Sequence, residues 1–387
     1  MDLSANERLV LDALAGGGVA SRAELSARTG LPKTTVGGIV DRLLRRGAVT
    51  QRPPAPRAGR GRPAGALALA TPSGPVAVLA LSHTTIRAAA VGWDGTVLAH
   101  RQDALAGDRD EERVIGRGVD LLTDALAEAG LRPDQASRAV VGVPAAYERG
   151  VGPTLGRIPE TAREAVPGLA EVFGWLRSDP APAVGARLGV PAVAENYANL
   201  AALGEAAFGA GRGVDSFVYV KVVEGVGAGL ILGGRLHRGA RGMAGELAHV
   251  QVLDDGPWCV CGSRGCLATT YGGFVPPFRP AYPTPLTVAD IGRLAAAGER
   301  GTRRIMADAG RRVGRVLADM CVLLSPDAFI VDGMLGAAAE PFVAGVREMI
   351  DRHTPGVLAD TVRVLPGELG DRAELLGAVA LARTDRP

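Results

Sequence analysis

Helix start and stop signals are closely spaced in the first fifty residues of the chain. The pattern Ser-x-x-Glu begins at Ser4 and again at Ser21, and in it the two side chains cap backbone groups at a helix start. The segments that follow have helical apolar spacing and stop at glycines: Gly16–Gly18, Gly30 and Gly47. The spacing predicts three short helices, the third beginning near Pro32, and a short strand at 48–50.

A tight turn between the second and third predicted helices is typical of a helix-turn-helix, which sets its second helix into the major groove of DNA. The start of that helix carries three side chains that can donate hydrogen bonds to phosphates or base edges: Lys33, Thr34 and Thr35. An ordinary three-helix bundle is the alternative, but such a bundle does not need donors at this position. We therefore expect these residues to contact double-stranded DNA.

The segment after the predicted strand is rich in Arg, Gly and Pro from Arg57 to Pro63, and an apolar run follows at 66–70. After a helix-turn-helix, a strand, a basic loop and a second strand predict a winged helix. Arg60 and Arg62 would then lie on the wing, where Arg side chains can enter a narrow minor groove. A flexible linker of the same composition is the alternative.

Charge and composition narrow the class of protein. Residues 1–70 contain eleven Lys and Arg and five Asp and Glu, a net charge of +6, whereas residues 71–387 carry −4. A basic head favours a polyanionic partner, the alternative being a solvated charged surface. The longest apolar runs, such as 76–81, are far shorter than the ~20 residues that span a bilayer. With no signal-peptide pattern and too few Cys for a disulfide scaffold, we expect a cytoplasmic protein without a membrane partner.

The rest of the chain has the pattern of an α/β protein. Residues 76–100 read as a β-hairpin, and a helical pattern at 110–130 alternates with strand-like runs at 139–143 and 217–222. Alternation of strands and helices predicts a body in which helices pack on sheets.

Three of the four Cys residues lie close together and follow a His. His249, Cys259, Cys261 and Cys266 offer one imidazole and three thiolates, the tetrahedral set that structural zinc prefers. Their short intervals allow one loop to wrap the ion. A redox pair at Cys259 and Cys261 is the alternative, although Cys-x-Cys closes a strained ring. Cys321 lies alone in an apolar stretch and reads as a buried packing residue.

These motifs resemble the ROK family of repressors, open reading frames and kinases. The resemblance rests on Gly245-Glu-Leu-x-His249, the Cys-x-Cys-Gly-x-x-Gly-Cys run and Leu375-Leu-Gly-Ala378, and it extends over the predicted winged helix and the whole body. It implies an actin-like, ribonuclease-H-like pair of α/β lobes that clasp a sugar. We predict a winged helix-turn-helix domain at 1–70 and an effector and oligomerisation domain at 71–387, with a zinc-stapled loop.

The loops that a kinase of this family uses are altered. The family's first phosphate loop, Asp-x-Gly-Gly-Thr, matches Ala80-Leu-Ser-His-Thr84, so Ala80 replaces the carboxylate. The second loop, Gly-x-Gly-x-Gly-x-Gly, matches 223–229, has lost its first Gly and gains Glu224, which would repel a phosphate. The family's catalytic base is an Asp that matches Tyr197, and a phenol with a pKa of about 10 is a poor base at neutral pH. We therefore expect no enzymatic activity.

The resemblance also implies a sugar site. Asn196, Glu246 and His249 match family positions that hold sugar hydroxyls, whereas Tyr197 and Ala268 replace two further carboxylates of that site. Three readings remain open: the ligand is not a common hexose, Tyr197 stacks on a sugar face, or sensing has been lost. Glu246 has a second reading, in which it only orients His249 toward the metal.

The residues and the resemblance together favour a DNA-binding transcriptional regulator, a repressor of sugar uptake or catabolism genes. Its expected partners are an inverted-repeat operator, a sugar or sugar-phosphate effector and further copies of the chain in a homodimer or homotetramer. Two alternatives belong to other classes. One is an ATP-dependent sugar kinase with divergent loops, and the other is a constitutive DNA-binding protein that senses no ligand.

Overall fold

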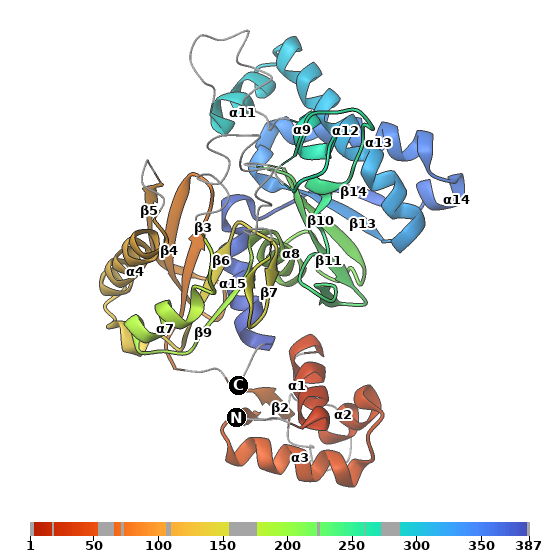
Figure 1. Cartoon of the computed structure of the whole chain (residues 1–387). Helices are drawn as coiled ribbons and strands as arrows, with labels where there is room; N and C mark the ends of the chain where they lie inside the picture. The colour runs from red at the N-terminus through yellow and green to blue at the C-terminus, as the bar shows by residue number, and fades with distance from the viewer. Residues whose placement is uncertain are drawn as a thin grey trace. The chain divides into compact units, whose positions relative to one another are not determined.

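The computed structural model describes residues 4–17, 19–52, 66–70, 73–105, 110–154, 176–222, 225–259, 261–271 and 287–384. The chain divides into two compact units, one of Met1–Ser73 with Leu381–Pro387 and one of Gly74–Ala380 (Figure 1). The domain limits predicted from the sequence, 1–70 and 71–387, stay a prediction. Within the described residues, none of the helices is long and apolar enough to cross a membrane.

The N-terminal unit consists of three helices and a two-stranded sheet. They are α1 (Ala5–Gly17), α2 (Arg22–Thr29), α3 (Lys33–Arg45), β1 (Val49–Arg52) and β2 (Ala66–Leu69). The strands pair antiparallel, from Val49 opposite Leu69 to Arg52 opposite Ala66. One apolar stripe of α3 is buried in the core of this unit: Val36, Ile39, Val40 and Leu43. The three helices, the strand after them and the second strand are thus as predicted.

The predicted helix signals act as expected. Ser21 and Glu24 form a capping box, in which the Glu24 carboxylate accepts a hydrogen bond from the Ser21 N–H at 2.7 Å. Glu7 likewise accepts from the Ser4 N–H at 2.9 Å. Gly30 ends α2 with φ +69°, a left-handed conformation that suits glycine and turns the chain into α3.

Glu7 also joins α1 to α3. Its side chain is 5% exposed and lies 3.1 Å from Arg42 Nε and 3.4 Å from Arg46 Nη1. The backbone hydrogen bond at Ser4, followed by the hydrogen bond from Arg42, lowers the pKa of Glu7 to about 2. This carboxylate therefore fixes the helix that carries the predicted DNA contacts.

The first lobe of the large unit is built on a five-stranded sheet ordered β5-β4-β3-β6-β9. Its strands are β3 (Val76–Leu81), β4 (Thr85–Val91), β5 (Val97–Ala104), β6 (Arg138–Val143) and β9 (Ala192–Asn196). Strands β3, β4 and β5 pair antiparallel, and β6 and β9 extend the sheet in parallel from β3. The helices of this lobe are α4 (Glu111–Glu128), which packs on β4 and β3, and α7 (Ala181–Leu188).

The second lobe repeats this pattern in a sheet ordered β12-β11-β10-β13-β14. Its strands are β10 (Phe217–Lys221), β11 (Gly227–Leu232), β12 (Arg235–His237), β13 (Ala328–Val331) and β14 (Arg363–Pro366). The other elements of the large unit are α8 (Tyr197–Phe208), α9 (Leu267–Tyr271), α11 (Val288–Ala296), α12 (Arg300–Leu324), α13 (Ala339–His353), α14 (Gly356–Ala359), α15 (Ala373–Thr384) and the short hairpin β7 (Tyr147–Glu148) and β8 (Gly152–Pro153). Each lobe has its own hydrophobic core, so the predicted two-lobed α/β body is confirmed.

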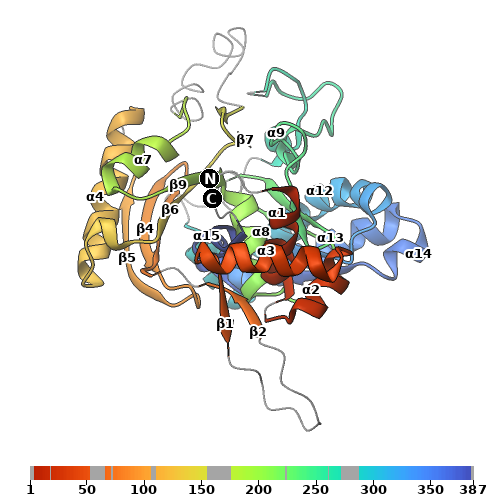
Figure 2. The same cartoon turned by 90° about the horizontal axis from the view of Figure 1, so that it is seen from below.

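Helices α8 and α15 lie between the two sheets (Figures 1 and 2). A Cβ atom at Gly377 would stand 1.7 Å from the backbone oxygen of Leu200, and one at Gly204 would stand 2.1 Å from that of Ala373. Only glycine fits at these two positions, because the helix backbones are in contact there. Cys321 is 1% exposed in the second core, as predicted.

We predict that Glu7→Gln destabilises the N-terminal unit by about 1–2 kcal/mol, since it leaves Arg42 and Arg46 without their shared carboxylate. The native pKa of about 2 lies below the ordinary 4.5, so the stabilisation is complete above pH 4.5 and is lost as the pH falls toward 2. Differential scanning calorimetry of the full chain at several pH values measures this. Asp41→Asn, which removes an exposed ion pair with Arg22, is the control and should change little.

Candidate functional site

The predicted DNA contacts lie at the start of α3. Lys33 and Thr34 are exposed and Thr35 is partly exposed, while the next residue, Val36, is buried in the core. The first turn of α3 thus presents these three side chains on one side and anchors the helix on the other. Arg60 and Arg62 lie outside the described residues, in the segment between β1 and β2.

Two glycines on α3 were not singled out from the sequence. A Cβ at Gly37 would meet nothing within 4 Å, and one at Gly38 would meet only Arg42 Nη1 at 3.8 Å. Gly in a helix interior costs up to about 1 kcal/mol relative to Ala, and here no neighbouring atom requires it. The bare backbone on this side of α3 is a second signal, besides the three donors, that a partner approaches this helix closely.

The predicted metal ligands lie together. The ligand atoms of His249, Cys259, Cys261 and Cys266 are all within 4.8 Å of one another, and all four Cys of the chain are free thiols. Cys259 Sγ is 3.4 Å from His249 Nδ1, and Cys261 Sγ is 3.6 Å from Cys266 Sγ. Zinc–sulfur and zinc–nitrogen bonds of about 2.3 and 2.0 Å at tetrahedral angles separate neighbouring ligand atoms by roughly 3.5 Å. The cluster could therefore hold a metal ion.

The backbone around the cluster is tightly folded. Cys259 N–H donates to Ser263 O at 2.8 Å, and the backbones of Gln251 and Cys266 form an isolated antiparallel β-bridge. A Cβ at Gly265, which has φ +62°, would stand 1.7 Å from Leu253 O. Burial raises the pKa of the Cys266 thiol to about 12 and lowers that of His249. A bound cation would offset the cost of forming a thiolate in this buried loop.

Asn196 ends β9 and caps α8. Its Oδ1 accepts hydrogen bonds from the N–H groups of Ala198 and Asn199 at 2.8 and 3.1 Å, and its Nδ2 donates to Ala145 O at 2.8 Å. Both polar groups of the predicted sugar contact are therefore engaged by the backbone. This role has a sequence signal, because Asn between a strand and a helix is a favoured N-cap.

Tyr197 begins α8 and is 7% exposed. The ammonium group of Lys221 lies over its ring, 4.9 Å from the centroid. At the ring's far end, a Cβ at Gly225 would be 3.8 Å from the hydroxyl. In the reading in which Tyr197 stacks on a sugar, the sugar would have to use the face of the ring that Lys221 does not occupy.

Glu246 precedes the 3₁₀ turn Leu247–His249, which ends in the metal cluster. Glu246 is partly exposed, and burial of its carboxylate raises its pKa to about 7. No hydrogen bond or ion pair from another described residue reaches this carboxylate. The N–H of Ala228 donates to Gly245 O at 2.8 Å, so Glu246 follows a residue that is bonded to the glycine-rich segment. A buried carboxylate in this setting suits a ligand hydroxyl.

Glu195 is a buried charge that the sequence reasoning missed. It is 0% exposed and accepts hydrogen bonds from Arg238 Nε at 2.7 Å and Asn199 Nδ2 at 2.9 Å. Arg238 follows β12, so this ion pair connects the end of β9 to the second lobe. The sequence around Glu195 gives no sign of this ion pair, because its partner Arg238 lies 43 positions further along the chain.

Two family models match this chain. The model of the ROK family matches residues 83–385, and that of the MarR family matches residues 1–61. The xylose repressor of Bacillus subtilis (strain 168) is 26% identical over 383 residues, covering 96% of this chain and 93% of the repressor. The glucokinase of Streptomyces coelicolor is 33% identical over 242 residues, covering 57% of this chain and 75% of the kinase.

Solved structures give the same two kinds of relative. A ROK family transcriptional regulator, a homologue of the E. coli MLC protein, has a TM-score of 0.74 at 20% identity over 98% of this chain and 95% of that one, a likeness of fold. A ROK family glucokinase from Streptomyces griseus, in complex with glucose and AMPPNP, has a TM-score of 0.64 at 27% identity over 80% of this chain and 99% of the kinase. The regulators match nearly the whole chain, whereas the Streptomyces griseus glucokinase covers 80% of it and the Streptomyces coelicolor glucokinase 57%.

We predict that freshly purified protein contains about one zinc ion per chain and that Cys261→Ser loses it. The same change should lower the melting temperature, because metal binding and folding of the loop are linked. Elemental analysis and thermal unfolding measure the two effects. Cys321→Ala is the matched control: this thiol lies in the second core, so the variant should lose stability and keep its zinc. Untreated wild-type protein without zinc would contradict the assignment.

Proposed function

The chain belongs to the ROK family, and we propose that it is a DNA-binding transcriptional repressor whose body responds to a sugar or sugar derivative and does not phosphorylate it. The observation that carries the proposal is the presence of a winged-helix unit and a ROK body in one chain, matched to xylose repressors over 96% of its length. Such a protein acts where the chromosome lies, so the proposal includes a cytoplasmic location.

The N-terminal unit supports the DNA-binding part of the proposal. Its recognition helix, α3, exposes Lys33 and Thr34 at its first turn. A helix held in the major groove reads bases through such side chains, while basic residues elsewhere contact phosphates. We keep Arg60 and Arg62 as wing contacts. We also propose that the chain forms a homodimer or homotetramer, so that paired heads read an inverted-repeat operator.

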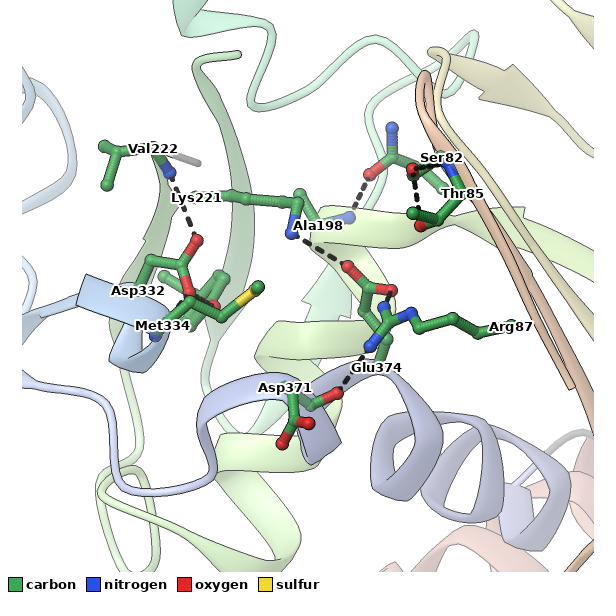
Figure 3. A network of polar contacts seen from close by, with 12 residues as sticks. Ser82, Thr85, Arg87, Ala198, Lys221, Val222, Asp332, Met334, Asp371 and Glu374 are labelled. Atoms are coloured by element: carbon green, nitrogen blue, oxygen red, sulfur yellow. Dashed lines mark hydrogen bonds and ion pairs between the residues drawn. The ribbon is translucent and has the colours of Figure 1, made fainter. Parts of the chain in front are cut away.

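The loop between β3 and β4 supports the loss of phosphoryl transfer. Ser82 Oγ accepts a hydrogen bond from the N–H of Thr84 at 3.1 Å and one from the N–H of Thr85 at 2.9 Å. Figure 3 shows Ser82 beside Thr85. A phosphate-binding loop offers its backbone N–H groups to the ligand. Here a side chain of the loop itself already occupies two of them. Ala80, buried at the end of β3, supplies no carboxylate for Mg²⁺.

The effector site is proposed around Glu246 and the β9–α8 junction, with Asn196, Tyr197 and His249 as further members. Glu246 supports this best, because its carboxylate is partly buried and no ion pair from another described residue reaches it. His249 would serve mainly as a zinc ligand beside Cys259, and zinc would hold Glu246's turn in place.

We predict that Thr35→Ala lowers the discrimination between operator and random DNA by about 1–3 kcal/mol, if Thr35 reads a base. Lys33→Ala should weaken binding to both kinds of DNA alike and reduce the salt slope by about one, since a phosphate contact carries no sequence information. Fluorescence anisotropy over a range of salt concentrations measures both effects. The duplexes are an operator selected in vitro from a random pool and its scrambled version.

Gly38→Ala is the sharper variant. It should stabilise α3 by up to about 1 kcal/mol, because Ala favours a helix more than Gly does and the added methyl group meets only Arg42 Nη1, at 3.8 Å, in the free protein. It should weaken operator binding, because the methyl group would stand where DNA approaches the helix. Unchanged DNA affinity in all three variants would show that α3 is not the reading helix.

We predict no glucose- or xylose-dependent ATP consumption above background, and no micromolar binding of Mg·ATP by calorimetry. Thermal unfolding in the presence of sugars and sugar phosphates should show stabilisation by a member of this class, and Glu246→Gln should reduce that shift. If none of these compounds changed the melting temperature, the result would favour a constitutive DNA-binding protein. Turnover of ATP with a sugar would favour the kinase.

A further inference from the structure

A buried cluster of charges joins the two lobes to α15 (Figure 3). Lys221, the last residue of β10, lies with its Nζ 2.8 Å from Glu374 Oε1, and both side chains are 5% exposed. The other carboxylate oxygen, Glu374 Oε2, forms an ion pair with Arg87 of β4, whose side chain is 11% exposed. One carboxylate on α15 thus holds a cation from each lobe.

A second buried carboxylate acts on Lys221. Asp332, 0% exposed at the end of β13, is the second carboxylate and accepts hydrogen bonds from the Met334 N–H at 3.1 Å and Tyr219 Oη at 3.2 Å. Burial would lower the pKa of Lys221, but the charge of Glu374, followed by that of Asp332, raises it above its ordinary value. Burial likewise opposes ionisation of Glu374, and Lys221 and Arg87 together lower its pKa. Lys221 is therefore held protonated and Glu374 ionised.

The two cations stand where the altered loops begin. Arg87 is directly opposite Ala80 in the antiparallel pair of β4 and β3, so the two side chains point to the same face of the sheet. Lys221 ends the strand that leads into the segment 223–229, and its ammonium lies over Tyr197. A carboxylate at position 80 would stand beside Arg87, but this chain has Ala80 there and brings a carboxylate from α15.

We propose that Arg87 and Lys221 form a site for a small oxyanion, and that Glu374 occupies it as an internal ligand, holding the two lobes together without a bound phosphate. The inference is independent of the DNA-binding role, since it concerns only the large unit. Removing the internal carboxylate without filling its space should open the site to a formate or phosphate ion from solution.

The test is thermal unfolding of the full chain carrying Glu374→Ala, in formate, phosphate and chloride at equal ionic strength. We expect a lower melting temperature than wild type in chloride and a saturable rise with formate or phosphate. The wild type should show no such difference between salts. Lys221→Met combined with Glu374→Ala should lose the response, because one of the two cations is gone.

Two controls separate an anion site from general effects. Glu374→Gln removes the negative charge, so this variant should be less stable than wild type. It keeps the volume of the side chain, so the site stays filled and the variant should not respond to formate. Glu340→Ala removes an ion pair with Arg303 in which both side chains are well exposed, and it should behave as wild type. Glu374→Ala with the wild-type melting temperature, or with the same temperature in formate, phosphate and chloride, would overturn the proposal.

If Glu374→Ala does not fold, Glu374→Gln and Lys221→Met with Glu374→Gln decide the question. The double variant removes the cation that the single variant leaves uncompensated, so it should be the more stable of the two. A double variant no more stable than Glu374→Gln would show that Lys221 does not depend on the carboxylate, and the proposal would fail.

Discussion

The contact between α8 and α15 sets the geometry of the large unit. Gly204 and Gly377 let the two backbones touch, and a methyl group at either position would collide with a carbonyl oxygen. Glu374 stands one turn before Gly377, and Asn196 caps the other helix two turns before Gly204. Lys221, which pairs with Glu374, also lies over the ring of Tyr197 at the start of α8, so the ion-pair cluster and the β9–α8 junction share a residue.

Buried charges at this crossing occur in connected sets. Glu374 forms ion pairs with Arg87 and Lys221, and Glu195, 0% exposed, forms ion pairs with Arg238 and Arg149. An unpaired charge in such a place is costly. The members of each set therefore depend on one another, because removing one leaves its partners without their opposite charge. Glu246 differs, because burial raises the pKa of its carboxylate and, among the described residues, no cation forms an ion pair with it. That contrast separates the groups that hold the fold from the group proposed to meet a ligand.

Local features of the structure could be predicted from the sequence, and long-range ones could not. Capping boxes, the turn at Gly30 and the Cys and His spacing each depend on residues a few positions apart, so their chemistry is visible in a short window. Arg87 and Glu374 are 287 residues apart, and nothing near either one indicates the other. The cap that Asn196 provides is a local feature, because its amide bonds to backbone groups at the start of α8. Its contact with a sugar stays a prediction.

The internal carboxylate also constrains how this chain could change over generations. Replacing Glu374 alone strands two buried cations, and replacing Lys221 or Arg87 alone leaves the carboxylate undercompensated. An acidic residue at position 80 would set a further negative charge beside this satisfied network, while Ser82 still accepts hydrogen bonds from the N–H groups of its loop. Each of these single changes therefore leaves a buried charge less well compensated than in the present chain. The effect of a substitution at one of these positions depends on the residues at the others.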